Sequence, residues 1–125
     1  MICGMGIDLV ENSRVEKIVK KWGDKFINRI FSDEEIKYCD KHVNASIHYG
    51  VRFAAKESFL KALGIGLGMG VKLSDIEVIN DENGKPSLNL YGEAKNQIKK
   101  RKITKVHLSL THTKNYSTAV VLLEK

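Results

Sequence analysis

The segment spanning residues 46–63 constrains the fold of this chain more strongly than any other part of its sequence. Its apolar side chains recur at intervals of three and four residues, as on the buried face of an α-helix: Tyr49, Phe53, Leu60 and Leu63. Gly64 follows directly, and glycine is the residue that most often lies just beyond the end of a helix. We therefore predict a long central helix that ends at Gly64.

The rest of the chain alternates between strand and helix patterns. Ser13 with Glu16, and Ser32 with Glu35, have the spacing of a capping box and mark the beginnings of two further helices. In chain order, the patterns predict a strand at 2–10, helices at 13–30, 32–42 and 46–63, a hairpin with strands around 76–78 and 88–90, a helix at 93–102, and strands at 106–111 and 116–123. The order β-α-α-α-β-β-α-β-β predicts an α+β fold, with a mainly antiparallel sheet packed against helices, in a single domain of residues 1–125.

The charge of the chain indicates an anionic partner. The formal net charge is +6 and the isoelectric point is about 9.3. Two stretches are strongly basic, because residues 12–30 hold six basic and two acidic residues, and residues 95–105 hold six basic residues and no acid. Either stretch can equally be the solvated face of a helix, which is the usual explanation for a run of charge.

Several features favour a cytoplasmic protein. No apolar run approaches the roughly 18 to 20 residues of a membrane span, and the first ten residues lack the pattern of an export signal. Cys3 and Cys39 are too few and too far apart for a disulfide framework or a zinc cluster. We expect both cysteines to be reduced and buried.

Glu57 is the residue of the central helix that is hardest to explain by packing alone. Its spacing places it between Phe53 and Leu60, so that a carboxylate points toward the core side of the helix. An unpaired buried carboxylate is costly and should be matched by a cation or by hydrogen-bond donors. Lys61 lies four residues further on, so an ordinary ion pair on the helix surface is the alternative.

Asp8 lies in the first strand on a face that has few side chains. The preceding residues of that face are Gly4 and Gly6, which leave open space beside the carboxylate. Glycine within a strand is tolerated where a ligand or another backbone approaches closely, although tight packing, a bulge or a capping role for Asp8 are alternatives. Two carboxylates from different elements, with room for water and phosphate oxygens, are a typical arrangement for holding Mg²⁺. We therefore expect the glycine face of this strand to meet the Phe53 and Leu60 side of the central helix, with both carboxylates facing one gap.

Two further features are weaker indications of function. The glycine-rich run at 64–70 follows a helix and lacks the Walker lysine, so we interpret Gly64 as a helix end and the remainder as a connection that offers backbone N–H groups to a phosphate. His112 shares a strand face with apolar residues, which predicts a partly buried histidine at a strand end. Ser109 and Thr111 lie on the opposite face, and no Ser-His-Asp or Cys-His nucleophile pair can be assembled.

Three blocks of sequence together resemble a known family. They are GMGIDLV at 4–10, RFAAKESFLKALG at 52–64 and HLSLTHTKNYSTAVVLLEK at 107–125. In this order they are similar to the signature blocks of the holo-acyl-carrier-protein synthase family of 4′-phosphopantetheinyl transferases. The resemblance implies transfer of phosphopantetheine from coenzyme A to a serine of an apo acyl carrier protein, with adenosine 3′,5′-bisphosphate as second product, in support of fatty acid biosynthesis.

The same resemblance implies roles for particular residues. Mg²⁺, or Mn²⁺ in its place, would be bound by Asp8, Glu57 and the pyrophosphate of coenzyme A, and Lys61 would contact phosphate. The base would be either Glu57 or a water on the metal. The implied coenzyme contacts are Lys56, the turn from Gly64 to Gly70, Pro86, Ser109 and His112. The family also implies a homotrimer with active sites between neighbouring subunits.

The basic first helix then has a candidate partner, because the carrier proteins of this family are small and acidic. The predicted docking residues are Arg14, Lys17, Lys20, Lys21 and Lys25. A small nucleic-acid-binding module is an alternative, but it lacks a recognisable reading element and leaves Asp8 and Glu57 beside phosphates that they would repel. An oligomeric structural protein also leaves both carboxylates unexplained. We therefore expect neither a nucleic acid nor a membrane as partner.

Overall fold

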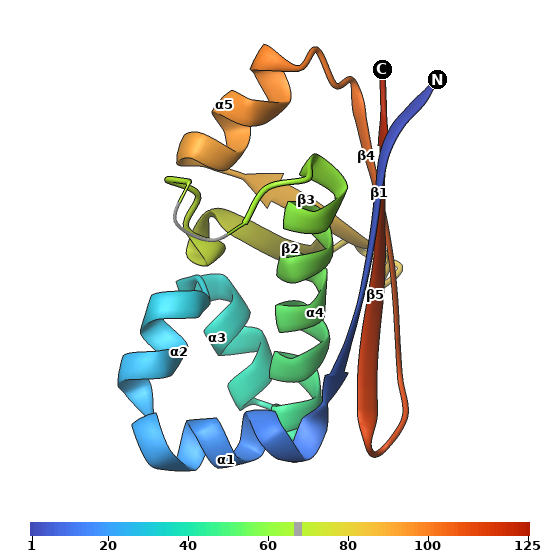
Figure 1. Ribbon diagram of the computed structural model, residues 1–125. Coiled ribbons are helices and arrows are strands. Elements are labelled where there is room, and N and C mark those ends of the chain that lie inside the picture. The colour runs from blue at the N-terminus through green and yellow to red at the C-terminus, as the bar shows by residue number, and fades with distance from the viewer. Residues whose placement is uncertain (67–68) are drawn as a thin grey trace.

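The computed structural model describes residues 1–66 and 69–125 and places both ends of the chain in one antiparallel sheet. Strands β1 (Ile2–Glu11), β5 (Tyr116–Glu124) and β4 (Lys105–His112) form this sheet in the order β1-β5-β4. The two termini lie side by side at one end of it (Figure 1). Strands β2 (Ile76–Asn80) and β3 (Pro86–Leu90) form a separate antiparallel hairpin.

Helix α4 (Ala45–Leu63) is the predicted central helix, and it packs along one face of the three-stranded sheet (Figure 1). Gly64 ends it in the left-handed conformation, with φ 71°, as its position predicts. The remaining helices are α1 (Asn12–Trp22), α2 (Asp24–Ile30), α3 (Asp33–Asp40) and α5 (Gly92–Lys100). Figure 1 shows α1 to α3 around one end of α4, and α5 near the other.

The predicted helix at 13–30 is divided into α1 and α2 by Gly23. This residue has φ 55° and ψ −134°, a conformation that ends one helix and that residues with a side chain rarely adopt. The capping box predicted at Ser13 is also wrong, because α1 begins one residue earlier and its N-cap, Glu11, makes no side-chain cap. The box predicted from Ser32 and Glu35 is confirmed at the start of α3. The predicted order of elements is otherwise found.

The two glycines of β1 allow the strand and α4 to touch backbone to backbone. A Cβ atom added to Gly6 would lie 1.9 Å from the carbonyl oxygen of Ser58, and one added to Gly4 would lie 2.3 Å from that of Ala62. Nearby, the Ser58 hydroxyl donates to the carbonyl oxygen of Ala119 in β5 at 2.9 Å. Close approach of another backbone is therefore the reason for these glycines.

Two expectations about this contact need correction. The space that we predicted beside Asp8 is filled at Gly4 and Gly6 by the backbone of α4. The glycines also meet a different face of the helix from the one that carries Phe53 and Leu60. Only a strand backbone without Cβ atoms can come this close to the helix. The sequence does not reveal which face of the helix will make this contact.

Lys56 and Glu35 form a fully buried ion pair that joins α4 to α3, to β2 and to the short 3₁₀ helix Leu73–Asp75. The Lys56 ammonium donates to Glu35 Oε1 at 2.7 Å and to the carbonyl oxygens of Leu73 and Ile76 at 2.9 and 2.6 Å. Glu35 also accepts from the backbone N–H of Ser32 and of Val78, both at 3.0 Å. All three ammonium protons are thus satisfied, which makes the burial of this charge tolerable.

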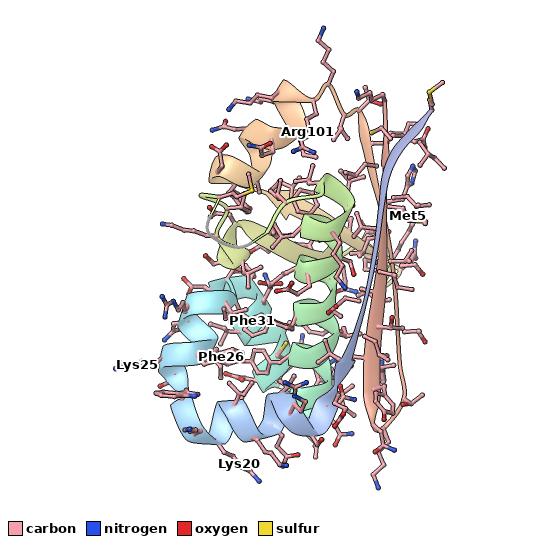
Figure 2. The ribbon with its side chains drawn as sticks, viewed as in Figure 1. Met5, Lys20, Lys25, Phe26, Phe31 and Arg101 are labelled. Atoms are coloured by element: carbon pink, nitrogen blue, oxygen red, sulfur yellow. The ribbon has the colours of Figure 1, made fainter. Side chains whose placement is uncertain are left out.

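The face of the sheet that points away from α4 is apolar and exposed. Met5, Ile7 and Leu9 alternate with the inward residues of β1, and they are 68%, 61% and 65% exposed. Figure 2 shows Met5 on the side of the sheet opposite α4. A row of large exposed apolar side chains on one strand is unusual for an isolated chain and indicates a contact surface.

The cysteines differ in their surroundings. Cys39 is buried as predicted, and burial raises the pKa of its thiol to about 12, which leaves it unreactive. Cys3 is exposed, so the prediction for this residue is wrong. Its place near the end of an edge strand explains the exposure, since α4 covers only the inward face.

None of the helices in the described part of the chain is long and apolar enough to cross a membrane.

Candidate active site

Asp8 is held on the inward face of β1 by contacts from two other elements. The hydroxyl of Thr118 in β5 donates to the backbone carbonyl of Asp8 at 2.7 Å. From α4, the Lys61 ammonium donates to Asp8 Oδ1 and to the carbonyl oxygen of Ile7, both at 3.0 Å. The Asp8 side chain is only 17% exposed, so its carboxylate is fixed in direction and partly removed from water.

Glu57 approaches Asp8 from α4. Burial raises the pKa of the Glu57 carboxyl, the negative charge of Asp8 raises it further, and Lys61 lowers it. Two carboxylates that repel each other beside one ammonium mark this place as a candidate functional site. The predicted meeting of these two residues from distant elements is therefore present in the structure.

Asp8 and Glu57 line one cleft with a volume of about 350 Å³. Its walls come from the end of β1, the start of α1, one side chain of α2 and two side chains from the middle of α4. The other lining residues are Leu9, Val10, Glu11, Arg14, Val15, Ile18, Phe26 and Phe53. Figure 2 shows Phe26 in the space between α2 and α4. The cleft thus combines acidic groups with an apolar wall and one arginine.

The two carboxylates fit a hard divalent cation as part of a larger ligand set. Mg²⁺ prefers oxygen ligands and is usually held by one or two carboxylates, with water and substrate phosphates completing its shell. Within residues 1–66 and 69–125, no group of three or more His, Cys, Asp or Glu side chains is placed to hold a metal. The remaining ligands would therefore have to come from water or from a bound anion.

The structure does not gather the predicted coenzyme contacts into this cleft. Lys56 is buried, and its ammonium already has three acceptors, so we withdraw it as a coenzyme contact. Ser109 lies exposed on the outer face of the sheet, opposite in direction to Asp8, and Pro86 begins β3. His112 lies exposed at the end of β4, although we expected it to be partly buried. Of the turn that starts at Gly64, residues 67 and 68 lie outside the described part of the chain.

A second polar region lies around Arg52. Its guanidinium stacks over the Tyr38 ring at 4.2 Å and donates to Asn80 Oδ1 at 3.1 Å. The nearby His42 and His48 rings are stacked at 4.0 Å, and His112 is 6.3 Å from His48. Burial, His42, Arg52 and His112 lower the pKa of His48 to about 4. We did not select Arg52 from the sequence. Its place as the first residue of the second family block could have marked it as a candidate.

The predicted docking residues are all exposed on α1 and the start of α2. Lys20 is paired with Glu16 at 3.0 Å, and the ammonium of Lys21 lies 5.2 Å from the centre of the Trp22 ring. Lys25 borders a hollow of about 560 Å³ whose other lining residues are Ile18, Trp22, Phe26 and Arg29. Figure 2 shows Lys20 and Lys25 on the outer side of these helices. This basic surface, which we call the α1–α2 face, is continuous with the cleft through Ile18 and Phe26.

Comparison with known proteins identifies the family. Residues 4–121 match the 4′-phosphopantetheinyl transferase superfamily, and the chain belongs to this family. It is 56% identical over 124 residues to a holo-[acyl-carrier-protein] synthase of Syntrophus aciditrophicus, covering 99% of this chain and 97% of that protein.

Solved structures of the same family confirm the predicted fold. The crystal structure of a holo-[acyl-carrier-protein] synthase from Neisseria meningitidis matches with a TM-score of 0.92 at 32% identity, over the full length of both chains. A synthase from Bacillus anthracis, in complex with CoA (3′,5′-ADP), matches with a TM-score of 0.81 at 38% identity, over 99% of this chain and 97% of that one.

Proposed function

We propose that this protein transfers the 4′-phosphopantetheine group of coenzyme A to a serine of an apo acyl carrier protein. The products are the holo carrier protein and adenosine 3′,5′-bisphosphate. The observation that carries this proposal is that Asp8 and Glu57 line one cleft, with Lys61 paired to Asp8, in a chain of this family. The relative named holo-[acyl-carrier-protein] synthase, and the Bacillus anthracis structure in complex with CoA (3′,5′-ADP), support it.

The reaction is proposed to need Mg²⁺, with Mn²⁺ as an alternative. Asp8 and Glu57 would hold the metal, together with the pyrophosphate of coenzyme A. When bound, the cation neutralises charge on the pyrophosphate and so favours attack at the β-phosphorus. The hard oxygen donors at the cleft support this choice of metal.

The chain's own groups orient and stabilise the reacting atoms. The carrier serine oxygen forms a bond to the β-phosphorus, while the bond to the bridging oxygen breaks and adenosine 3′,5′-bisphosphate leaves. Lys61 is half exposed on a flexible stem, so its ammonium can contact the phosphoryl oxygens where negative charge develops. Glu57 lies in the cleft beside Asp8 and is our proposed acceptor of the serine proton, directly or through water.

The α1–α2 face is the proposed docking surface for the carrier protein. Its exposed arginine and lysines would attract an acidic partner, and the exposed Trp22 and Ile18 would give it an apolar centre. Interfaces of this kind combine apolar anchors with a charged rim. Because the face borders the cleft, a carrier serine docked there would reach Asp8 and Glu57.

The protein is further proposed to act as a homotrimer. The exposed row of Met5, Ile7 and Leu9 supplies an apolar surface for contact with other copies. Ser109 lies on the same outer face of the sheet. In the proposed trimer this residue would therefore face the neighbouring copy and its cleft. A role in fatty acid biosynthesis and a cytoplasmic location are part of the same proposal.

A transfer assay tests the proposed function. The protein is incubated with coenzyme A, Mg²⁺ and an apo acyl carrier protein, and mass spectrometry follows the phosphopantetheine adduct on the carrier serine. We expect the adduct to form, to need the metal, and to fall at least 100-fold in rate with Asp8→Ala or Glu57→Ala. Glu34→Ala, which removes an exposed carboxylate on α3, is the control. Absence of the adduct with the unmodified protein would contradict the proposal.

A further inference from the structure

Lys61 of α4 forms its ion pair with a residue of β1 and not with a neighbour on its own helix. The spacing along α4 suggested Glu57 as its partner, yet the Lys61 ammonium lies 3.0 Å from Asp8 Oδ1 and 3.0 Å from the carbonyl oxygen of Ile7. The lysine side chain is 55% exposed, whereas that of Asp8 is 17% exposed. A half-exposed cation is therefore paired with one of the two carboxylates that we assign to the metal.

This pairing changes the charge that a divalent cation meets in the cleft. Asp8 and Glu57 repel each other, and Lys61 offsets part of that repulsion. With its ammonium in place, the three groups carry a net charge of about −1, compared with −2 for the carboxylates alone. A dication near Asp8 must share the carboxylate with the ammonium and is repelled by it, which weakens binding.

We infer that Lys61 is a built-in counter-ion that competes with the divalent cation for Asp8, so that metal and coenzyme bind tightly only together. The anionic pyrophosphate offers the ammonium a second partner and draws it away from Asp8. Because lysine is a flexible point charge with three rotatable donors, this exchange needs no movement of α4. The inference rests on the proposed function, since it assumes that Asp8 and Glu57 hold the metal.

The exchange has a thermodynamic consequence. If coenzyme A removes the competing ammonium, it must increase the affinity for the metal, and the metal must increase the affinity for coenzyme A by the same factor. Part of this coupling comes from direct contact between metal and pyrophosphate. The rest of the coupling is due to Lys61 and should disappear when its ammonium is removed.

The test measures Mn²⁺ binding to the protein alone, from the electron paramagnetic resonance signal of the free ion. We expect Lys61→Met to bind Mn²⁺ about tenfold more tightly than the unmodified protein, which is the size of one partly screened charge interaction. Lys37→Met removes the same charge from an exposed pair with Glu34 and is expected to leave the affinity within about twofold. Equal or weaker binding by Lys61→Met would overturn the inference.

A second arm adds coenzyme A to each protein. The increase in Mn²⁺ affinity that it causes should be about tenfold smaller in Lys61→Met than in the unmodified protein, and an equal increase would also overturn the inference.

Asp8→Ala and Glu57→Ala separate this inference from the proposed function. Both variants should lose Mn²⁺ binding if the carboxylates hold the metal. If they bind Mn²⁺ normally, the metal site itself is wrong and the inference is overturned with it. If they lose the ion while Lys61→Met gains nothing, only the competition is wrong.

Discussion

The negative charge of Glu57 destabilises the folded chain. Its carboxyl is half-buried and faces Asp8, and both conditions raise its pKa above the ordinary value of 4.5. The native state therefore holds this proton to a higher pH than the unfolded chain. Its contribution to stability is most favourable below about pH 4.5 and is lost as the pH rises through the folded-state pKa.

This sign gives a prediction for Glu57→Gln. In metal-free buffer at pH 7, the variant should melt about 2 °C higher than the unmodified protein, because it lacks the charge that repels Asp8. Near pH 4 the two melting temperatures should converge, since the glutamate is then largely protonated in both states. Thermal melts at the two pH values, followed by circular dichroism, measure the difference. A gain that is the same at both pH values would show that the charge is not its cause.

At the scale of single elements, the contact between β1 and α4 depends on the absence of side chains. Gly6→Ala would place a methyl group 1.9 Å from the Ser58 carbonyl oxygen and force the two backbones apart. We expect it to lower the free energy of unfolding by about 2–3 kcal/mol, measured by urea unfolding. Gly66→Ala is the control, because among the described residues no atom beyond its chain neighbours lies within 4 Å of its added Cβ. Similar losses in both variants would argue against the packing explanation.

The buried pair of Lys56 and Glu35 fixes α4 against α3 and β2. Lys56→Met leaves the Glu35 carboxylate buried without its cation, so the free energy of unfolding should fall by about 3–5 kcal/mol. Replacing both residues by methionine should recover part of this loss, because no unpaired charge remains. Urea unfolding compares the variants with Lys37→Met, whose exposed pair should contribute less than about 1 kcal/mol. A double variant as unstable as the single one would contradict the charge argument.

At the scale of the whole molecule, the charge of the α1–α2 face should govern association with the carrier protein. Lys17→Glu with Lys21→Glu should raise the KM for an acidic carrier about tenfold and change kcat little, because the two residues do not line the cleft. Lys95→Glu with Lys99→Glu makes the same change of charge on α5 and serves as the control. Steady-state kinetics at low and high salt measure both pairs. Equal effects would assign the result to net charge instead of docking.

The exposed sheet face gives a prediction for the oligomeric state. Met5→Lys introduces a charge into the apolar row of β1 and should convert the proposed trimer to a monomer, measured by light scattering after size-exclusion chromatography. Val43→Lys, at a fully exposed apolar residue in the turn between α3 and α4, should leave the mass unchanged. A trimer that persists in Met5→Lys would show that this face is not the contact.

Much of the fold could be predicted because short-range patterns determine where helices and strands begin and end. The capping box at Ser32 and the glycine at the end of α4 act through hydrogen bonds within a few residues. Gly23 shows the limit of such patterns. The helical spacing of apolar residues continues across Gly23, although the backbone conformation of this residue ends α1. A hydrophobic pattern alone does not record a break in backbone conformation.

Sequence patterns were enough to predict the order of the elements, to find the family blocks and to select Asp8 and Glu57 as the carboxylates of the candidate site. The folded structure was needed to show that Lys61 pairs with Asp8, 53 residues away, and that Lys56 is buried in the core. It also decided that the glycines of β1 meet the backbone of α4 and that its apolar face points outward. The physical reason is that periodicity tells which residues share a face, whereas the partner of that face depends on how distant segments pack.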